Sequence, residues 1–409
     1  MIPDSVLQQL RRDTPACTHV THLNNAGAAL MPDPVYTAIT DHLSLERDIG
    51  GYEAAERAAD RIAAAYRSIA AVVGASERNI AIVPHATAAF AQALAAFDFN
   101  AGDRIVTSEA DYVSHQLMFF ALAGRRGVEI VRAANGPDGG VDPDDVRRLA
   151  AHPRCRLVSI CWMPTNSGLV QDVQAVGAIC RQIGVPYLVD GCQAVGQIPI
   201  DVAALQCDFL TATGRKFLRG PRGIGFLYAS DNVLDRALYP STIDTRGARW
   251  TADEAFVIDD SARRFEHWEF PYALVLGLGA AADYAIGVGV EAASVRARSL
   301  AVRLRSLLAP VDAWRVLDDH PNASAIVTVS LGAFDPQHAV ALLQRAGFNA
   351  SVTFREWARF AMGRAGVEAA LRVSPHYYNT EDEIDRFVLT LKDLVRHPAG
   401  AHPDTQAGA

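Results

Sequence analysis

The sequence predicts an α/β fold: a large doubly wound, mostly parallel sheet followed by a smaller α+β domain. Short β-branched runs alternate with helical patterns from about residue 60 to 230, as in a parallel sheet with helices on both faces. From about residue 260 the pattern changes to long alanine- and leucine-rich helical sequence. A chain of 409 residues with 50% hydrophobic content is long enough for two domains, each with its own core.

The elements of the large domain follow in order from the hydrophobic pattern. Each predicted strand is a short apolar run, and each predicted helix repeats its apolar positions every three or four residues. The predicted strands are Ile80–Val83, Arg104–Thr107, Val128–Arg132, Arg156–Cys161, Pro186–Asp190, Asp208–Ala212 and Ile224–Tyr228. The predicted helices between them are Thr87–Ala96, Val113–Ala123, Pro143–Ala150 and Val173–Ile183. Ligands of such sheets bind beyond the carboxyl ends of the strands, so residues that follow a strand are candidates for a site.

The C-terminal part is predicted to form the smaller domain. Its expected elements are a helical region at Leu274–Leu308, a strand at Ala325–Leu331, a helix at Pro336–Ala346, a strand at Leu371–Ser374 and a last helix at Thr380–Arg396. We expect residues 1–20 to pack with the small domain, residues 21–260 to form the large domain and residues 261–396 the small one. The Pro/Gly/Ala-rich tail, 397–409, is expected to be disordered.

Composition argues against several classes of function. The net charge is −8 without a block of like charge, which argues against nucleic acid or an anionic membrane as the main partner. The N-terminus lacks a basic-then-apolar signal, and no uncharged apolar run reaches membrane-spanning length. We therefore expect a cytoplasmic protein. Its six cysteines form no Cys-x-x-Cys pair and no cysteine–histidine cluster at metal-ligand spacing, so we expect buried free thiols and no metal.

Lys216 is the first candidate for chemistry. Only two lysines occur in the chain, and the other, Lys392, lies in a polar stretch near the C-terminus. A lysine ammonium can lose its proton and attack a carbonyl, whereas a guanidinium stays charged. Lys216 follows a predicted strand within the glycine-containing run 213–223, and Asp190 ends the strand before it. An ordinary surface turn and a strand-end aspartate are the alternatives for each residue taken alone.

The segments Tyr187–Ala194, Asp208–Lys216 and Gly220–Phe226 together resemble the class V aminotransferase and cysteine desulfurase family of fold-type I pyridoxal-phosphate enzymes. The resemblance extends from His22–Gly27 to Asn379–Asp385. It implies pyridoxal 5′-phosphate as cofactor, bound through an imine to the lysine of the second segment, Lys216.

The resemblance also assigns roles to residues around that lysine. Asp190 is expected to pair with the pyridine nitrogen and so keep the ring protonated. The phosphate is expected on backbone N–H groups at a helix start, Ala86-Thr87-Ala88, although Thr87 could also be a simple helix N-cap. Thr213 and Arg215 match further phosphate-contacting positions, and Arg215 stands where desulfurases commonly have histidine.

The cofactor ring and the substrate have candidates of their own. Tyr112 matches the position that stacks on the ring, with a half-buried loop tyrosine as the alternative. Gln193 matches the donor to the phenolic oxygen, with Thr165 or Asn166 nearby; which of these two points inward stays open. Arg372 matches the arginine that binds the substrate carboxylate, with a surface arginine as the alternative. The substrate-binding residues expected from two further resembling segments are Asn25 and Tyr52.

One departure from the family pattern bears on the reaction. A cysteine desulfurase needs a thiol on a loop of the small domain, but the matching region, Ala350–Trp357, has no cysteine, and none follows Cys207. Cys192, beside Asp190, is expected to be a packed thiol. The sequence looks closest to the branch with ergothioneine-pathway C–S lyases and isopenicillin N epimerase-like proteins.

This branch implies β-elimination from a cysteine-type substrate, either S-substituted or a sulfoxide. The alternatives are epimerisation, transamination, sulfur transfer and a non-catalytic cofactor-binding scaffold. The family also implies a homodimer with shared active sites, in which residues near Glu266–Phe270 reach the neighbour, although the threonine that desulfurases have there is missing.

Overall fold

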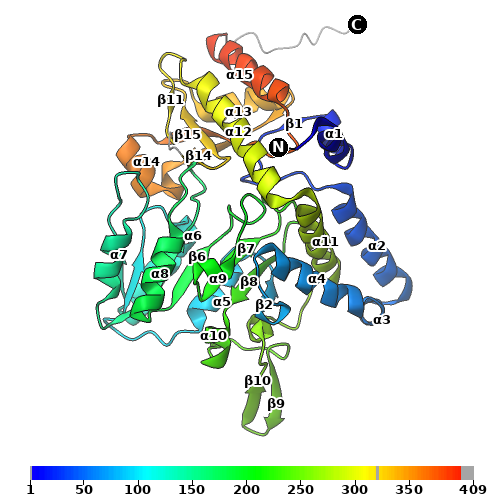
Figure 1. The fold of residues 1–409 in the computed structure, drawn as a ribbon, viewed down its shortest axis with the longest axis vertical. Helices are drawn as coiled ribbons and strands as arrows, with labels where there is room; N and C mark the ends of the chain where they lie inside the picture. The colour runs from blue at the N-terminus through cyan, green and yellow to red at the C-terminus, as the bar shows by residue number, and fades with distance from the viewer. Residues whose placement is uncertain (1, 319–321, 398–409) are drawn as a thin grey trace, which may run out of the picture.

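The computed structural model describes residues 2–318 and 322–397. Figure 1 shows a large domain built around one sheet and a smaller domain stacked on it, with a β-hairpin projecting from the far end. Beyond His397, the tail expected to be disordered lies outside the described residues.

The large domain is built on a seven-stranded sheet with the order β2-β8-β7-β6-β5-β3-β4. Its strands are β2 (Ile80–Val83), β3 (Arg104–Thr107), β4 (Glu129–Arg132), β5 (Cys155–Cys161), β6 (Tyr187–Asp190), β7 (Phe209–Thr213) and β8 (Gly225–Ala229). The predicted strands are confirmed to within one residue at each end. The five strands from β7 to β4 are parallel, whereas β8 runs antiparallel to both β2 and β7.

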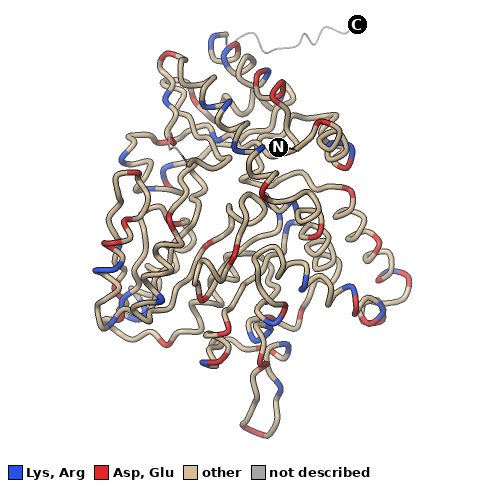
Figure 2. The backbone as a smooth tube through the Cα atoms, in the orientation of Figure 1, with Lys and Arg blue, Asp and Glu red and all other residues tan. Residues whose placement is uncertain are grey.

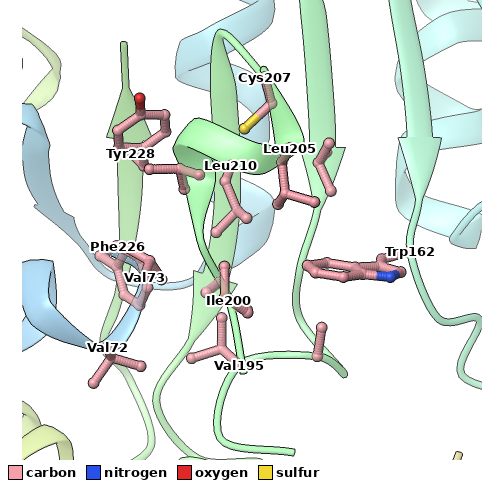
Figure 3. Close-up of a cluster of buried hydrophobic side chains, with 14 of the residues drawn as sticks. Val72, Val73, Trp162, Val195, Ile200, Leu205, Cys207, Leu210, Phe226 and Tyr228 are labelled. Carbon is pink, nitrogen blue, oxygen red and sulfur yellow. The ribbon is translucent and has the colours of Figure 1, made fainter. Parts of the chain in front are cut away.

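Both faces of this sheet are buried, so its strands are almost continuously hydrophobic. One face packs against α4 (Ala59–Val72), α7 (Pro143–Ala150), α8 (Val173–Ile183) and α11 (Tyr272–Val288), and Figure 3 shows part of that core around Leu210 and Phe226. The other face packs against α5 (Ala86–Ala95) and α6 (Val113–Arg126). Successive strand residues alternate between the two cores, as Leu188 and Val189 do.

The remaining elements of the large domain lie at its edges. They are α2 (Asp33–Ile49), α3 (Gly51–Arg57), α9 (Val202–Leu205), α10 (Asp231–Asp235), the hairpin β9 (Ala248–Ala252) and β10 (Ala255–Ile258), and the 3₁₀ turns Glu77–Asn79 and Ala262–Phe265. The hairpin has no buried face, so it lacks the alternation that would have predicted it. Trp250 at 81% is among its exposed side chains.

The small domain has an antiparallel sheet with the order β11-β12-β15-β14. These strands are β11 (Arg315–Val316), β12 (Val327–Ser330), β15 (Ala369–Val373) and β14 (Ser351–Phe354). The domain's helices are α12 (Val290–Leu308), α13 (Pro336–Arg345), α14 (Arg359–Ala365) and α15 (Glu381–Arg396), with a 3₁₀ turn at Arg355–Trp357. Thr380 and Glu383 form a capping box at the start of α15, which fixes where the last helix begins.

The N-terminal segment packs against the small domain, which the C-terminal part of the chain forms. Helix α1 (Asp4–Arg12) places Leu7 and Leu10 in a small core with Tyr377 and Tyr378 of the small domain. A 3₁₀ turn follows at Pro15–Thr18, and β1 (Thr21–His22) pairs in parallel with β13 (Phe348–Asn349).

The long helical region of the C-terminal half is two helices rather than one. Gly289, at φ +84°, separates α11 from α12, and the helices meet at 80°. Val275 and Leu278 of α11 belong to the core of the large sheet, whereas α12 packs in the core of the small domain. Helix α11 therefore packs with the large domain and α12 with the small one.

Among the described residues, no single helix is long and apolar enough to cross a membrane; α11 and α12 meet that criterion only as a bent pair. Figure 2 shows that Lys and Arg positions are interspersed with Asp and Glu positions along the backbone.

Candidate active site

A cavity opens at the carboxyl edge of the large sheet, where β3, β5, β6 and β7 end. It is lined by His85, Ala86, Thr87, Tyr112, His115, Cys161, Met163, Thr165, Asp190, Cys192, Gln193, Thr213, Arg215 and Lys216. Nine of the residues predicted from the sequence are in this set. The shared position of their strand ends brings them together, as expected for a doubly wound sheet.

Lys216 lies in a tight loop directly after β7 and is 8% exposed. The loop closes on itself through hydrogen bonds from Arg219 N to Lys216 O at 2.8 Å and from Gly220 N to Gly214 O at 2.8 Å. Gly214 suits this close approach, because a Cβ there would lie 2.8 Å from Leu278 Cδ1 and would force the Leu278 side chain to shift. The loop thus fixes the backbone of Lys216 so that its side chain lines the cavity.

Arg219 anchors the far side of this loop. Its backbone has φ +63°, and its fully buried guanidinium donates to Tyr377 Oη at 2.6 Å, Thr14 Oγ1 at 2.6 Å and the Leu30 carbonyl at 2.8 Å. These contacts tie the loop to the N-terminal segment and to the small domain. A positive φ in a residue other than glycine is costly and persists only where such surroundings enforce it.

Asp190 ends β6 and is 4% exposed. Its Oδ1 accepts a hydrogen bond from Cys192 N at 2.9 Å, and its Oδ2 accepts from Cys161 Sγ at 3.5 Å. Burial, followed by the charge of Asp190, raises the pKa of the thiols of Cys161 and Cys192. These cysteines therefore favour the unreactive thiol form, in line with the prediction that Cys192 is packed.

The N-terminus of α5 supplies backbone donors to the same cavity. Ala86 and Thr87 line it, whereas Ala88 donates its N–H to Nδ1 of His85 at 3.0 Å. The helix cap is therefore His85, not Thr87. The unpaired N–H groups of a helix start, together with the helix dipole, favour an anion at this point.

Two guanidinium groups lie at or beside the cavity. Arg215 lines it and donates to the Gly27 carbonyl through Nη1. Arg372, on β15 of the small domain, is not among the lining residues but contacts one of them: its Nη1 donates to Thr165 Oγ1 at 2.7 Å, its Nη2 to Asn24 Oδ1 at 3.2 Å and its Nε to Ser351 Oγ at 3.1 Å. Burial, and then the charge of Arg215, lowers the pKa of Arg372 to about 10. An anion between the two groups would relieve this repulsion.

The choice between Thr165 and Asn166 is resolved by the cavity lining. Thr165 faces the cavity and accepts from Gln193 Nε2 at 3.2 Å, whereas Asn166 is absent from the lining and accepts from Thr328 through its carbonyl. Tyr112 lines the cavity at the start of α6, edge-on to His115. Thr213 lines it at the end of β7.

Two expected substrate-binding residues do not line this cavity. Asn25 is fully buried, donates to the Ser374 carbonyl at 2.7 Å and accepts from Tyr378 Oη at 2.5 Å, so its amide is occupied and its neighbour Asn24 contacts Arg372 instead. Tyr52 is 72% exposed on α3 and lines a separate groove with Trp268. A single sequence does not show which of two adjacent asparagines points inward, or that α3 lies at the edge.

Several lining residues were not predicted: His85, His115, Cys161 and Met163. His85 follows β2, and a position at or just after a strand end is the signal that located Asp190 and Lys216. His115 lies in the first turn of α6, four residues after Asp111. Cys161 and Met163 give no signal beyond their place at the end of β5.

A buried lysine and aspartate at the carboxyl edge of a mostly parallel sheet, opposite a helix N-terminus, define a fold-type I enzyme. The chain belongs to the aminotransferase class-V family, whose profile matches residues 21–387. This confirms the resemblance inferred from the sequence motifs.

Curated relatives span nearly the whole chain. A probable cysteine desulfurase of Methanothermobacter thermautotrophicus is 27% identical over 399 residues, which are 95% of this chain and 98% of that protein. A probable hercynylcysteine sulfoxide lyase of Mycobacterium tuberculosis is 26% identical over 399 residues, with coverage of 95% and 93%.

Solved structures share the fold. The apo cysteine desulfurase from Thermococcus onnurineus NA1 has a TM-score of 0.88 at 22% identity, covering 97% of this chain and 98% of the other. A mutant of the cystine C–S lyase C-DES, with glycine covalently linked to its PLP cofactor, has a TM-score of 0.83 at 22% identity, covering 94% of this chain and 99% of the other. The α/β fold with a large, parallel-dominated sheet is thereby confirmed.

Proposed function

We propose that the protein is a pyridoxal 5′-phosphate-dependent C–S lyase that removes the sulfur substituent of a cysteine-type amino acid by β-elimination. The observation that carries the proposal is the convergence of the amine of Lys216, the carboxylate of Asp190 and the backbone donors of Ala86 and Thr87 on one cavity. An aldehyde cofactor with a basic ring nitrogen and a phosphate requires these three groups.

The donor set fits that cofactor. Gln193 Oε1 is buried without a hydrogen-bond partner among the described atoms, while its Nε2 already contacts Ala26 and Thr165. Thr165 Oγ1 accepts from both Gln193 and Arg372, which leaves the Thr165 hydroxyl hydrogen for an acceptor in the cavity, such as the phenolic oxygen of the cofactor. Tyr112 supplies an aromatic face. When bound, the cofactor withdraws electrons from the substrate α-carbon.

The chain's own residues divide the remaining tasks. Arg372, fixed by Thr165 and Asn24, binds the substrate carboxylate and so orients the α-carbon. With the cofactor bound, the amine of Lys216 would take the α-proton, and Asp190 would hold a proton on the ring nitrogen. Loss of the α-proton would allow the C–S bond to break with its electron pair on sulfur, and the lysine ammonium could return the proton to that leaving group. Water would release the remaining three-carbon fragment as pyruvate and ammonia.

Two observations favour elimination over sulfur transfer. No cysteine follows Cys207, so β14 and the turn after it offer no thiol to receive sulfur. A relative across almost the full length is described as a sulfoxide lyase. A sulfoxide or activated thiolate leaves without a second nucleophile, so the cavity needs no further thiol.

The test is product analysis. Purified protein with added cofactor is incubated with S-alkylcysteines, their sulfoxides, cystine and cysteine, and pyruvate is followed through lactate dehydrogenase. We expect stoichiometric pyruvate and ammonia from the S-substituted compounds, and none with Lys216→Ala. Exchange of α-deuterium without keto acid would instead indicate an epimerase, and keto acid formed only with an acceptor a transaminase. Sulfide release from cysteine without pyruvate would indicate a desulfurase.

We also propose that the active protein is a homodimer. Tyr52, Trp268 and Leu43 are exposed side chains around one groove at the edge of the large domain, and burial against a second copy would remove this apolar surface from water. Tyr52 would then serve the neighbour's cavity rather than its own. Sedimentation equilibrium of the native protein and of Tyr52→Ala/Trp268→Ala tests this assembly; a native monomer would contradict it.

A further inference from the structure

We propose that His115, held by Asp111, is a positioning residue for Asp190: it lies beside the Asp190 carboxylate and fixes its orientation. This inference rests on the proposed pyridoxal-phosphate site but adds to it a pair of residues outside the roles assigned above. The contacts that support it lie between α6, the end of β3 and the end of β6.

The first step is that Asp111 is fixed in one orientation. Its Oδ2 accepts from Thr107 Oγ1 at 2.7 Å, and its Oδ1 accepts from Tyr112 N at 2.7 Å. The side chain is fully buried. A buried carboxylate with donors on both oxygens cannot rotate without losing charge-assisted hydrogen bonds. Asp111 is therefore a rigid acceptor.

The second step is that Asp111 fixes the orientation and tautomer of His115. Nδ1 of His115 lies 2.8 Å from Asp111 Oδ1. Because a carboxylate only accepts, Nδ1 carries a hydrogen. The imidazole also stacks on Phe90 of α5, with ring centroids 3.6 Å apart and planes inclined by 6°. Its side chain is 2% exposed, so packing and hydrogen bonding fix the same ring position.

The imidazole of His115 also lies close to the carboxylate of Asp190. The same Nδ1 lies 4.0 Å from Asp190 Oδ2, which is too long for a hydrogen bond but within the range of electrostatic attraction. Among the described residues, Asp190 Oδ2 otherwise accepts only from the weak thiol donor of Cys161 at 3.5 Å. The Nδ1 hydrogen of His115 is directed at Asp111, so His115 acts on Asp190 as a fixed polar ring beside the carboxylate. In a buried site, such a fixed dipole beside an anion stabilises one carboxylate orientation.

The test is a double-mutant cycle on cofactor affinity. His115→Phe keeps an aromatic ring against Phe90 but removes the N–H. Asp190→Asn removes the carboxylate on which His115 is proposed to act. Dissociation constants for pyridoxal phosphate are measured by absorbance titration of the apo protein for the native chain, both single variants and the double variant. Melting temperatures of the apo proteins report on folding.

We expect His115→Phe to weaken cofactor binding about tenfold, the scale typical when an outer partner of a binding group is removed. In the Asp190→Asn background the same substitution should have no further effect, because the group it positions is gone. Multiplicative effects of the two substitutions would show that His115 acts only through packing and would overturn the inference.

Two further variants keep the result interpretable. Asp111→Asn should weaken binding in the same direction as His115→Phe, and their combination should be no worse than either alone. Phe119→Leu, one turn further along α6 in the same core, is the packing control and should leave affinity unchanged. If His115→Phe fails to fold, His115→Gln, which keeps an N–H donor without the ring stack, replaces it and should retain most of the affinity.

The outcomes separate the inference from the function on which it rests. A native protein that shows no saturable binding of pyridoxal phosphate would remove the proposed function and this inference together. If the native protein binds pyridoxal phosphate, Asp190→Asn abolishes that binding and His115→Phe leaves the dissociation constant unchanged, the inference about His115 would be overturned while the proposed function would stand.

Discussion

Nε2 of His376 donates to the carbonyl of Phe217 at 2.9 Å. Arg372 is in β15, and His376 lies in the segment that follows this strand. The hydrogen bond therefore joins that segment to the loop that carries Lys216. Nδ1 of the same ring accepts from Tyr377 N at 2.8 Å, so the imidazole is neutral and both nitrogens are used. The residue expected to bind the substrate and the residue expected to react with it are thus held together across the two domains by one buried ring.

That ring predicts a pH dependence of stability. Burial, and then the charge of Arg219, lowers the pKa of His376 to about 3. The unfolded state binds a proton near pH 6.5 and the folded state does not, so this stability is present above pH 6.5 and is lost as pH falls toward 3. We expect the unfolding free energy to decline by up to about 1.4 kcal/mol per pH unit in that window. Urea unfolding at several pH values measures it.

His376→Gln keeps a donor for Phe217 but cannot be protonated, so its decline should be smaller. His19→Gln, at an exposed position, is the control and should behave as the native chain. An unchanged slope in His376→Gln would contradict the assignment.

Glu266 predicts the opposite dependence. Burial raises its pKa to about 7, although Ile82 N and Tyr66 Oη both donate to Oε1 at 2.7 Å. The folded state holds a proton that the unfolded state has lost above pH 4.5, so stability falls as pH rises from about 4.5 to 7. Glu266→Gln keeps an oxygen for both donors and should remove this fall. If Glu266→Gln shows the same dependence of unfolding free energy on pH as the native protein, Glu266 is not the group responsible for the fall.

Gly214 predicts a steric limit next to the reactive lysine. Gly214→Ala should destabilise the protein by about 1–3 kcal/mol, because the new methyl overlaps Leu278 in a packed core. Leu278→Val removes the overlapping atom, so the cost of Gly214→Ala should shrink in that background. Thermal unfolding of the four proteins measures the coupling; a cost independent of residue 278 would rule out this contact as the cause.

Arg372 predicts a loss of substrate binding without loss of cofactor. Arg372→Lys keeps the charge but not the paired donors, and we expect kcat/KM for the best S-substituted cysteine to fall about 100-fold. Cofactor affinity should change little. The control is Arg359→Lys on the exposed face of α14, which should retain native kinetics. Equal losses of cofactor and substrate binding would show that Arg372 is structural.

The sequence predicted what depends on spacing along a strand. Asp190 and Lys216 each follow a buried strand, and parallel strands end at one edge, so their convergence could be foreseen. The antiparallel direction of β8 could not, because a strand buried on both faces reads the same in either direction.

Side-chain directions in irregular segments were also beyond the sequence. Asn24 and Asn25 are adjacent residues of the same type, and only the path of the loop decides which side chain points toward the site. The Asn25 side chain forms hydrogen bonds with Ser374 and Tyr378, which come from a distant part of the chain. His115 was overlooked because its partner across the fold, Asp190, is 75 residues away. Such contacts are set by tertiary packing, which leaves no local pattern.

The most direct test of the central claim is borohydride reduction of the protein with bound pyridoxal phosphate, followed by peptide mass analysis. The chain has two lysines, Lys216 and Lys392, so the result separates them clearly. We expect the reduced cofactor on the peptide that contains Lys216 and on no other. A label on Lys392 alone, or no label in a protein saturated with cofactor, would contradict the account.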